Sequence, residues 1–237
     1  MSKPCIYLIP NLLGDDCSPE RVLPAENNTV IESLNNFAVE NLKDARRFLV
    51  KLGLKPKIDT SSFYNLNKKS SLTDLTELTA KIKSGESVGI ISDAGCPGVA
   101  DPGALLVKWA HDNKVDVLPL IGPSSILLAL MASGFSGQSF AFQGYLDRES
   151  SKRSQQLRKM EADSRQLNQS QLFMETPYRN MAVLEDVLKT LNPSTKFCIA
   201  ANISLPNEYI RTKTVQEWRK IQLPNLQKQP AIFLISA

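Results

Sequence analysis

The 237-residue chain is poor in the side chains that metal and nucleophilic sites use. Its one histidine, His111, falls in a predicted helix beside Lys108 and Asp112, where we expect a solvated side chain and not a Ser-His-Asp or metal site. The four cysteines have no zinc-type spacing, and nothing in their pattern indicates secretion. We therefore expect no metal site, and reduced thiols in a cytoplasmic protein at Cys5, Cys17, Cys96 and Cys198.

Long apolar runs and a strong charge of one sign are also missing. No apolar run approaches the length of a membrane span, so we expect no membrane partner. The N-terminal segment MSKPCIYLIPN carries one lysine and no evident small-residue cleavage site, and we interpret it as a first strand instead of a signal peptide. The formal net charge of +4 permits a nucleic-acid partner, with a simple solubility margin as the alternative.

The first half of the chain alternates strand-like and helix-like segments. Apolar runs of strand length occur at 5–9, 36–39, 87–92 and 115–121, and we expect the last two to be buried. Apolar residues at helical spacing predict helices over 42–54 and 72–85, the second capped by Thr73. This alternation predicts parallel pairing in an α/β sheet.

The second half has strands in closer succession. We expect strands over 139–146, 171–176, 196–202, 208–213 and 230–237, and helices over 123–134, 150–168 and 179–191. Strands separated by short or missing helices favour antiparallel pairing. The expected fold class is therefore α/β with two α/β domains, a mostly parallel sheet in 1–120 and a mixed sheet in 121–237.

The segment SDAGCPGVADPG, residues 92–103, follows a predicted buried strand and precedes a predicted helix. Its glycines, Gly95, Gly98 and Gly103, allow positive φ angles and a close approach of a ligand. Pro97 and Pro102 stiffen the segment, and Asp93 and Asp101 offer acceptors for ribose hydroxyls or an ammonium group. A tight turn with Pro102 starting the helix is the alternative, but it leaves most of this small, rigid loop unexplained.

The absence of two sequence motifs narrows the classes of ligand that this loop is expected to bind. Neither G-x-G-x-x-G nor G-x-x-x-x-G-K-[ST] occurs in the chain, so a phosphate cradle is disfavoured. A ligand with a ribose, an amino-acid head and no phosphate fits the loop. S-adenosylmethionine is such a ligand.

Four segments, in order, carry a resemblance to a known family. They are the glycine-rich loop at 92–103, IGPS at 121–124, GYLD at 144–147 before a basic helix, and FMETPYR at 173–179. Together they resemble the tetrapyrrole methylase superfamily of S-adenosylmethionine-dependent methyltransferases, and within it the 16S ribosomal RNA 2′-O-ribose (cytidine) methyltransferase branch. The substrate-side motifs have diverged: 39–43 is VENLK where that branch has A-E-D-T-R, and 200–205 is AANISL where it has A-R-E-L-T-K.

The resemblance implies an S-adenosylmethionine cofactor in the cleft between the two domains, and a homodimer. The cofactor contacts that it implies are Pro10, Ser92, Asp93, Gly95, Pro97, Val99, Ala100, Asp101, Gly122, Ser124, Ser125, Met174, Ala200 and Ala201. It further implies methyl transfer to RNA, at a ribose 2′-hydroxyl, with RNA or a ribosomal subunit as partner. A tetrapyrrole or other small-molecule acceptor, and a cofactor- or ribosome-binding module without catalysis, are the alternatives.

Methyl transfer from a sulfonium needs alignment and, for a hydroxyl acceptor, a nearby base, but no metal. Three carboxylates at predicted strand ends are the candidate bases, Glu40, Asp93 and Glu175, with helix capping as the alternative for Glu40 and Glu175. Candidate substrate contacts are Lys152, Arg153 and Arg179. The alternatives are a solvated face for the basic helix and an ion pair with Glu175 for Arg179.

Overall fold

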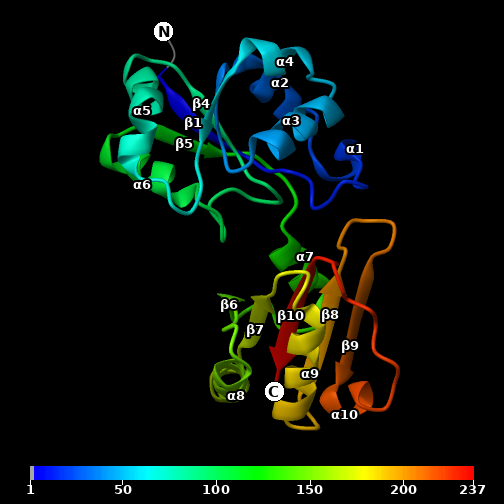
Figure 1. The fold of residues 1–237 in the computed structure, drawn as a ribbon. Helices are drawn as coiled ribbons and strands as arrows, with labels where there is room; N and C mark the ends of the chain where they lie inside the picture. Colours follow the sequence, from blue (N-terminus) through cyan, green and yellow to red (C-terminus); the bar gives the residue numbers. More distant parts are fainter. Residues whose placement is uncertain (1–2) are drawn as a thin grey trace. The chain divides into compact units, whose positions relative to one another are not determined.

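The computed structural model describes residues 3–237, which divide into two compact units (Figure 1). The first unit ends at Ser124, and the second spans Ser125–Ala237. Each unit contains a five-stranded sheet with helices packed against it, as expected for two α/β domains. No helix among the described residues is both long enough and apolar enough to cross a bilayer.

The sheet of the first unit is parallel throughout, in the order β3-β2-β4-β1-β5. Its strands are β1 (Cys5–Ile9), β2 (Asn36–Val39), β3 (Ser62–Asn65), β4 (Val88–Ile91) and β5 (Asp116–Pro119). The expected parallel sheet is confirmed. Burial of β5 was wrongly predicted: β5 is an edge strand that pairs with β1 alone, and Leu118 is exposed.

Helices connect these strands: α1 (Pro19–Val22), α2 (Glu26–Ser33), α3 (Leu42–Lys51), α4 (Pro56–Thr60), α5 (Thr76–Lys83), preceded by a 3-10 turn at Leu72–Leu75, and α6 (Ala104–Asp112). Leu78 of α5 and Leu106 of α6 share one core with Ile6 and Val88 of the sheet. The predicted cap at Thr73 is wrong, because the cap is Ser71, two residues earlier, which forms a capping box with Asp74 at the start of the 3-10 turn.

The order of the strands in the first unit indicates where a ligand site is expected. The connection from β1 leads to β2 in one direction along the sheet, and the connection from β4 leads to β5 in the other. Since parallel crossovers are right-handed, these two connections leave toward opposite faces of the sheet. The carboxyl ends of β1 and β4 are therefore a topological switch point, where open α/β sheets bind ligands.

The second unit has the strand order β6-β7-β10-β8-β9. Its elements are α7 (Ser125–Ser133), β6 (Phe140–Tyr145), α8 (Ser150–Leu167), β7 (Ser170–Met174), α9 (Asn180–Thr190), β8 (Lys196–Ala201), β9 (Tyr209–Thr214), α10 (Val215–Trp218) and β10 (Ala231–Ser236). β6 pairs with β7 in parallel and every other pair is antiparallel, so the predicted mixed sheet is confirmed. Phe233 stacks on Phe173 and Phe197 at its centre, with ring centroids 5.3 and 5.8 Å apart.

Candidate functional site

Two loops meet at the carboxyl ends of β1 and β4, and Asn11 joins them. The backbone N–H and C=O of Asn11 both hydrogen bond to Gly95, at 2.9 and 3.1 Å. The buried Asn11 side chain donates to the carbonyls of Ser92, at 2.9 Å, and Asp93, at 3.2 Å. One side chain thus fixes the loop at 10–14 to the glycine-rich loop at 92–103.

The glycine-rich loop is also fixed from within. The buried Ser92 hydroxyl donates to the carbonyl of Gly95 at 2.5 Å. One carboxylate oxygen of Asp101 accepts from the N–H groups of Gly98, at 2.9 Å, and Gly103, at 2.7 Å. Ser92 and Asp101, both predicted cofactor contacts, therefore hold the loop in place with these atoms.

Glycine occupies positions 95, 98 and 103 of this loop for different physical reasons. Gly95 and Gly98 have φ angles of +66° and +80°, as expected. The expectation for Gly103 is wrong, because its φ of −53° is ordinary; a Cβ there would lie 2.8 Å from the Asp101 carboxylate. A Cβ on Gly95 would meet Leu13 and the Pro123 carbonyl at 3.3 Å, while one on Gly98 would meet nothing closer than 3.9 Å.

Other predicted cofactor contacts of the first unit divide by exposure. Val99 and Ala100 are exposed, and Ala100 adopts a φ of +57°, a strained value for a non-glycine residue. Pro97 and Pro10 are buried. A Cβ on Gly122 would lie 2.2 Å from the Pro10 ring, so glycine at 122 is required by packing.

Two of the predicted carboxylates lie close together in the first unit. Glu40 follows β2 and Asp93 follows β4, and these strands are neighbours in the sheet. Burial raises the pKa of Glu40, and the negative charges of Asp93 and Asp101 raise it further. Although the Asp93 residue is exposed, partial desolvation of its carboxyl group raises its pKa, with Asp44 and Asp101 adding to the shift and a hydrogen bond from the Asn41 backbone opposing it. Both carboxylates are therefore poised to accept a proton more readily than a solvated one.

The capping alternative for Glu40 is not what the structure contains. Asn41 is the N-cap of α3, and its side chain accepts from the Lys43 N–H at 3.0 Å. Glu40 precedes the cap and is half-buried. Its side chain is thus not used to begin the helix.

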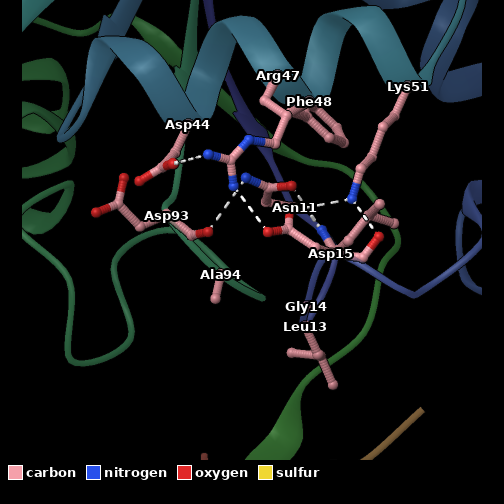
Figure 2. A pocket seen from close by; sticks show the side chains of 11 residues that line it. Asn11, Leu13, Gly14, Asp15, Asp44, Arg47, Phe48, Lys51, Asp93 and Ala94 are labelled. Atoms are coloured by element: carbon pink, nitrogen blue, oxygen red, sulfur yellow. Dashed lines mark hydrogen bonds and ion pairs between the residues drawn. The ribbon is translucent and has the colours of Figure 1, made fainter. Parts of the chain in front are cut away.

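A pocket opens between α3 and the two loops (Figure 2). Arg47 and Lys51 of α3 point into it and share the carboxylate of Asp15, with N–O distances of 2.8 and 3.2 Å. Asp44 approaches Arg47 at 3.7 Å, and Asp93 lines the same pocket. The pocket is therefore charged with both signs, and it adjoins the candidate base.

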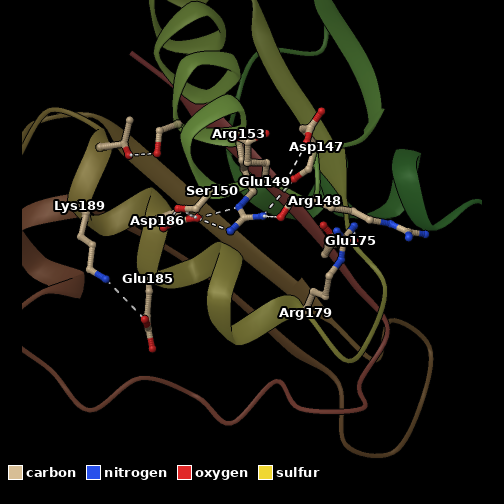
Figure 3. Close-up of polar contacts among 12 residues, drawn as sticks. Asp147, Arg148, Glu149, Ser150, Arg153, Glu175, Arg179, Glu185, Asp186 and Lys189 are labelled. Atoms are coloured by element: carbon tan, nitrogen blue, oxygen red, sulfur yellow. Dashed lines mark hydrogen bonds and ion pairs between the residues drawn. The ribbon is translucent and has the colours of Figure 1, made fainter.

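The third candidate base, Glu175, lies in the second unit just after β7. Its fully buried side chain forms an ion pair with Arg179 (Figure 3). It also accepts a hydrogen bond from the Thr176 N–H at 2.6 Å. The alternative of an Arg179–Glu175 pair is therefore the one that the structure contains. One oxygen of Glu175 and one nitrogen of Arg179 are buried without a hydrogen-bond partner.

The predicted substrate contacts on α8 behave differently from each other. Arg153 is 5% exposed; its guanidinium pairs with Asp186 of α9 and donates to the carbonyls of Asp147 and Arg148, each at 3.0 Å (Figure 3). We therefore retain no substrate role for Arg153. Lys152 is exposed and pairs with Glu149 at 2.9 Å. The interpretation of α8 as a largely solvated face fits Lys152 and Lys159, which pairs with Asp163.

The remaining predicted contacts are strand-end and linker residues. Met174 ends β7 and is half-buried, whereas Ala200 and Ala201 of β8 have no exposed surface. Ser124 and Ser125 stand at the division between the units and are half-buried. Within residues 3–237, no group of three His, Cys, Asp or Glu side chains is arranged to hold a metal ion.

Sequence reasoning missed the residues that build the pocket: Asn11, Asp15, Asp44, Arg47 and Lys51. Only the apolar face of the 42–54 segment entered the prediction. A signal was present, since Asp44, Arg47 and Lys51 are spaced three and four residues apart and so lie on one side of a helix. The loop partner Asp15, 32 residues from Arg47, had no comparable signal.

Comparison with known proteins finds relatives in sequence and similar solved structures. Ribosomal RNA small subunit methyltransferase I of Vibrio cholerae is 30% identical over 216 residues, which cover 90% of this chain and 70% of that protein. The methyltransferase CobJ has a similar structure, with a TM-score of 0.64 at 16% identity over 100% of this chain and 94% of that one.

A second similar structure is uroporphyrin-III C-methyl transferase from Thermus thermophilus complexed with S-adenyl homocysteine, with a TM-score of 0.56 at 15% identity over 98% of this chain and 96% of that one. The chain matches no protein-family model. At these identities the two structures bear on the fold alone.

Proposed function

This chain belongs to the ribosomal RNA small subunit methyltransferase I family of the tetrapyrrole methylase superfamily, and from that premise we propose that it methylates a ribose 2′-hydroxyl of an RNA, with S-adenosylmethionine as donor. The observation that carries this proposal is the pair of carboxylates, Glu40 and Asp93, at neighbouring strand ends beside the glycine-rich loop. A hydroxyl acceptor needs such a base, and the loop supplies the adjoining ligand surface.

The residues of the loop fit the proposed cofactor. The exposed Asp93 carboxylate can accept hydrogen bonds from ribose hydroxyls or an ammonium group, and Val99 and Ala100 are exposed beside it. Because Asn11, Ser92 and Asp101 already fix the loop, little ordering entropy is lost on binding. S-adenosylmethionine supplies an activated methyl group when bound. The expected contacts in the second unit, Met174, Ala200 and Ala201, rest on the family resemblance.

The chain's own contribution to the reaction is to orient the acceptor and take its proton. We assign the proton to the Asp93 carboxylate, because Asp93 is exposed to an incoming hydroxyl and Glu40 is half-buried. The negative charge of Asp93 adds to burial in raising the pKa of Glu40, so the two carboxylates affect the same part of the site. Glu175 is not assigned this role, since Arg179 pairs with it.

We also propose a homodimer in the cytoplasm. The dimer follows from the family resemblance, and the apolar helix α7 supports it, because Met131 on that helix is 77% exposed. The location follows from the proposed acceptor, ribosomal RNA.

The proposal is tested by calorimetry and by label transfer. S-adenosylmethionine and S-adenosylhomocysteine should both bind the purified chain with measurable heat, and tritium from the donor methyl should enter the RNA fraction of a cell extract. Label confined to small molecules would favour a tetrapyrrole-like acceptor, the class that one neighbouring structure's name suggests. Binding without transfer would favour a module that has lost catalysis, and the absence of binding would contradict the cofactor.

A further inference from the structure

The pocket beside Asp93 contains a carboxylate held by two cations. One oxygen of Asp15 lies 2.8 Å from Nη1 of Arg47 and the other lies 3.2 Å from Nζ of Lys51 (Figure 2). Arg47 and Lys51 are one turn apart on α3, so the two cations face the pocket from a rigid element. Asp15 comes from a loop, and 66% of its side chain is exposed.

We propose that Arg47 and Lys51 bind a phosphodiester of the acceptor RNA, and that Asp15 occupies the place of that phosphate in the free protein. The inference rests on the proposed function and names the part of the site that holds the RNA backbone. A carboxylate bridging two cations has the two oxygens and the single negative charge that a phosphodiester also presents. The Asp15 carboxylate thus occupies the position that we assign to the RNA phosphate.

The exchange of Asp15 for a phosphate is easy on physical grounds. Ion pairs between exposed side chains contribute little, because solvent screens them and two long side chains must be ordered. Arg47 is 42% exposed in its side chain, and Asp15 is held by these cations from a solvent-facing loop. The hydrogen bond from Arg47 to Asp15 uses Nη1 alone, whereas a guanidinium can give a phosphate two parallel hydrogen bonds, so an RNA strand can replace this internal partner.

The position of the pocket supports an RNA ligand over an isolated phosphate. Asp93, the assigned base, lines the same pocket as Arg47 and Lys51. A phosphodiester on these cations places the adjoining ribose next to Asp93. Such a contact orients the strand without reading its sequence.

The test compares two adjacent arginines of α3. Arg47→Ala removes the proposed phosphate contact, and Arg46→Ala is the matched control, because Arg46 lies over the Phe63 ring at 5.9 Å and not in the pocket. We expect the Arg47 variant to bind a single-stranded small-subunit RNA oligonucleotide about tenfold more weakly, with a salt-dependence slope smaller by about 1. The Arg46 variant should bind RNA as the parent does. Equal loss in both variants would overturn the proposal.

Asp15 allows a second test, in which the expected change in RNA affinity is the opposite of that for Arg47. Asp15→Asn removes the competing charge, so RNA binding should tighten by about threefold, while the neighbouring exposed Asp16→Asn should leave it unchanged. Weaker binding by the Asp15 variant would mean that Asp15 belongs to the binding surface, and would overturn the proposal that it occupies the position of the phosphate. Heat of S-adenosylhomocysteine binding, equal in all four variants, serves as the folding control.

Two further outcomes separate this inference from the proposed function. If the parent chain methylates RNA and the Arg47 variant does so with an unchanged KM, the inference fails and the proposed function stands. If the parent binds no RNA at all, the proposed acceptor itself fails. If inorganic phosphate stabilises the parent through Arg47 but RNA binding does not depend on Arg47, the pocket holds free phosphate and the proposal is overturned.

Discussion

At the residue scale, the ionised carboxylate of Glu40 lowers the free energy of unfolding, whereas a neutral glutamine at this position does not. Its pKa is raised above the ordinary value of 4.5, so the folded chain binds more protons than the unfolded chain from about pH 4.5 upward. The free energy of unfolding therefore falls as pH rises through that range. We predict that Glu40→Gln raises the unfolding temperature at pH 7, that the gain disappears below about pH 4, and that methyl transfer weakens.

Asp15→Asn is the matched control for this titration, because Arg47 and Lys51 lower the pKa of Asp15. The ionised Asp15 contributes a small stability above its ordinary pKa of 3.8 that is lost as pH falls, so its replacement should lower the unfolding temperature at pH 7 only slightly, because solvent screens this exposed pair. Thermal unfolding of both variants at pH 7 and pH 4 shows whether each substitution raises or lowers the unfolding temperature. A lower unfolding temperature for the Glu40 variant at pH 7 would contradict the assignment of a destabilising carboxylate.

Asp101 tests the internal support of the glycine-rich loop. Asp101→Ala leaves the N–H groups of Gly98 and Gly103 without their acceptor, and we predict a loss of about 1–3 kcal/mol in the free energy of unfolding together with weaker cofactor binding. Asp101→Asn keeps one acceptor oxygen and should lose less than half of that. Urea unfolding and calorimetry measure the two effects. Equal effects of both substitutions would show that the charge of Asp101 matters more than its hydrogen bonds.

Some residues of the site were predictable and others were not, for physical reasons. The position of Asp93 just after a buried strand and the positive φ of Gly95 and Gly98 follow from local sequence, since a small-residue loop after such a strand restricts the backbone of its members. Arg153 was assigned to substrate because it sits in a basic helix. Its real partner, Asp186, is 33 residues away, and no local pattern reveals that pairing.

At the scale of elements, the Arg153–Asp186 pair joins α8 to α9. Both side chains are nearly buried, and removal of one partner leaves a charge without compensation. We predict that Arg153→Ala lowers the free energy of unfolding by about 3–5 kcal/mol, while Lys152→Ala, an exposed neighbour, changes it little. Urea unfolding measures both. An Arg153 variant of unchanged stability that has lost RNA binding would restore the substrate role.

Elements with an apolar run or apolar residues at helical spacing were predicted with nearly the right bounds. β1 at Cys5–Ile9 matches the expected 5–9, and α3 at Leu42–Lys51 matches the start of the expected 42–54. β3, with the sequence SFYN, pairs with β2 but is largely exposed and shows no apolar run. β5 has an apolar sequence yet lies at the sheet edge. Position in a sheet is decided by topology, which local hydrophobicity does not encode.

At the scale of the whole molecule, the exposed apolar surface of α7 is the feature that the proposed dimer explains. Met131→Glu places a charge on this surface, and we predict that it converts the dimer to single chains at micromolar concentration. Met131→Gln, which adds no charge, should retain more of the dimer. Light scattering gives the mass directly. A single-chain mass for the parent protein would contradict the dimer itself.

The central claim is methyl transfer to a ribose hydroxyl of RNA, and the fate of the label in alkali tests it most directly. Alkali cleaves RNA through attack by the free 2′-hydroxyl, so a methylated ribose protects the phosphodiester that follows it. Small-subunit ribosomal RNA labelled by the purified chain from tritiated S-adenosylmethionine should release its label in alkali-resistant dinucleotides, and Asp93→Asn should abolish that label. Label recovered in mononucleotides, or none in RNA while the cofactor still binds, would contradict the account.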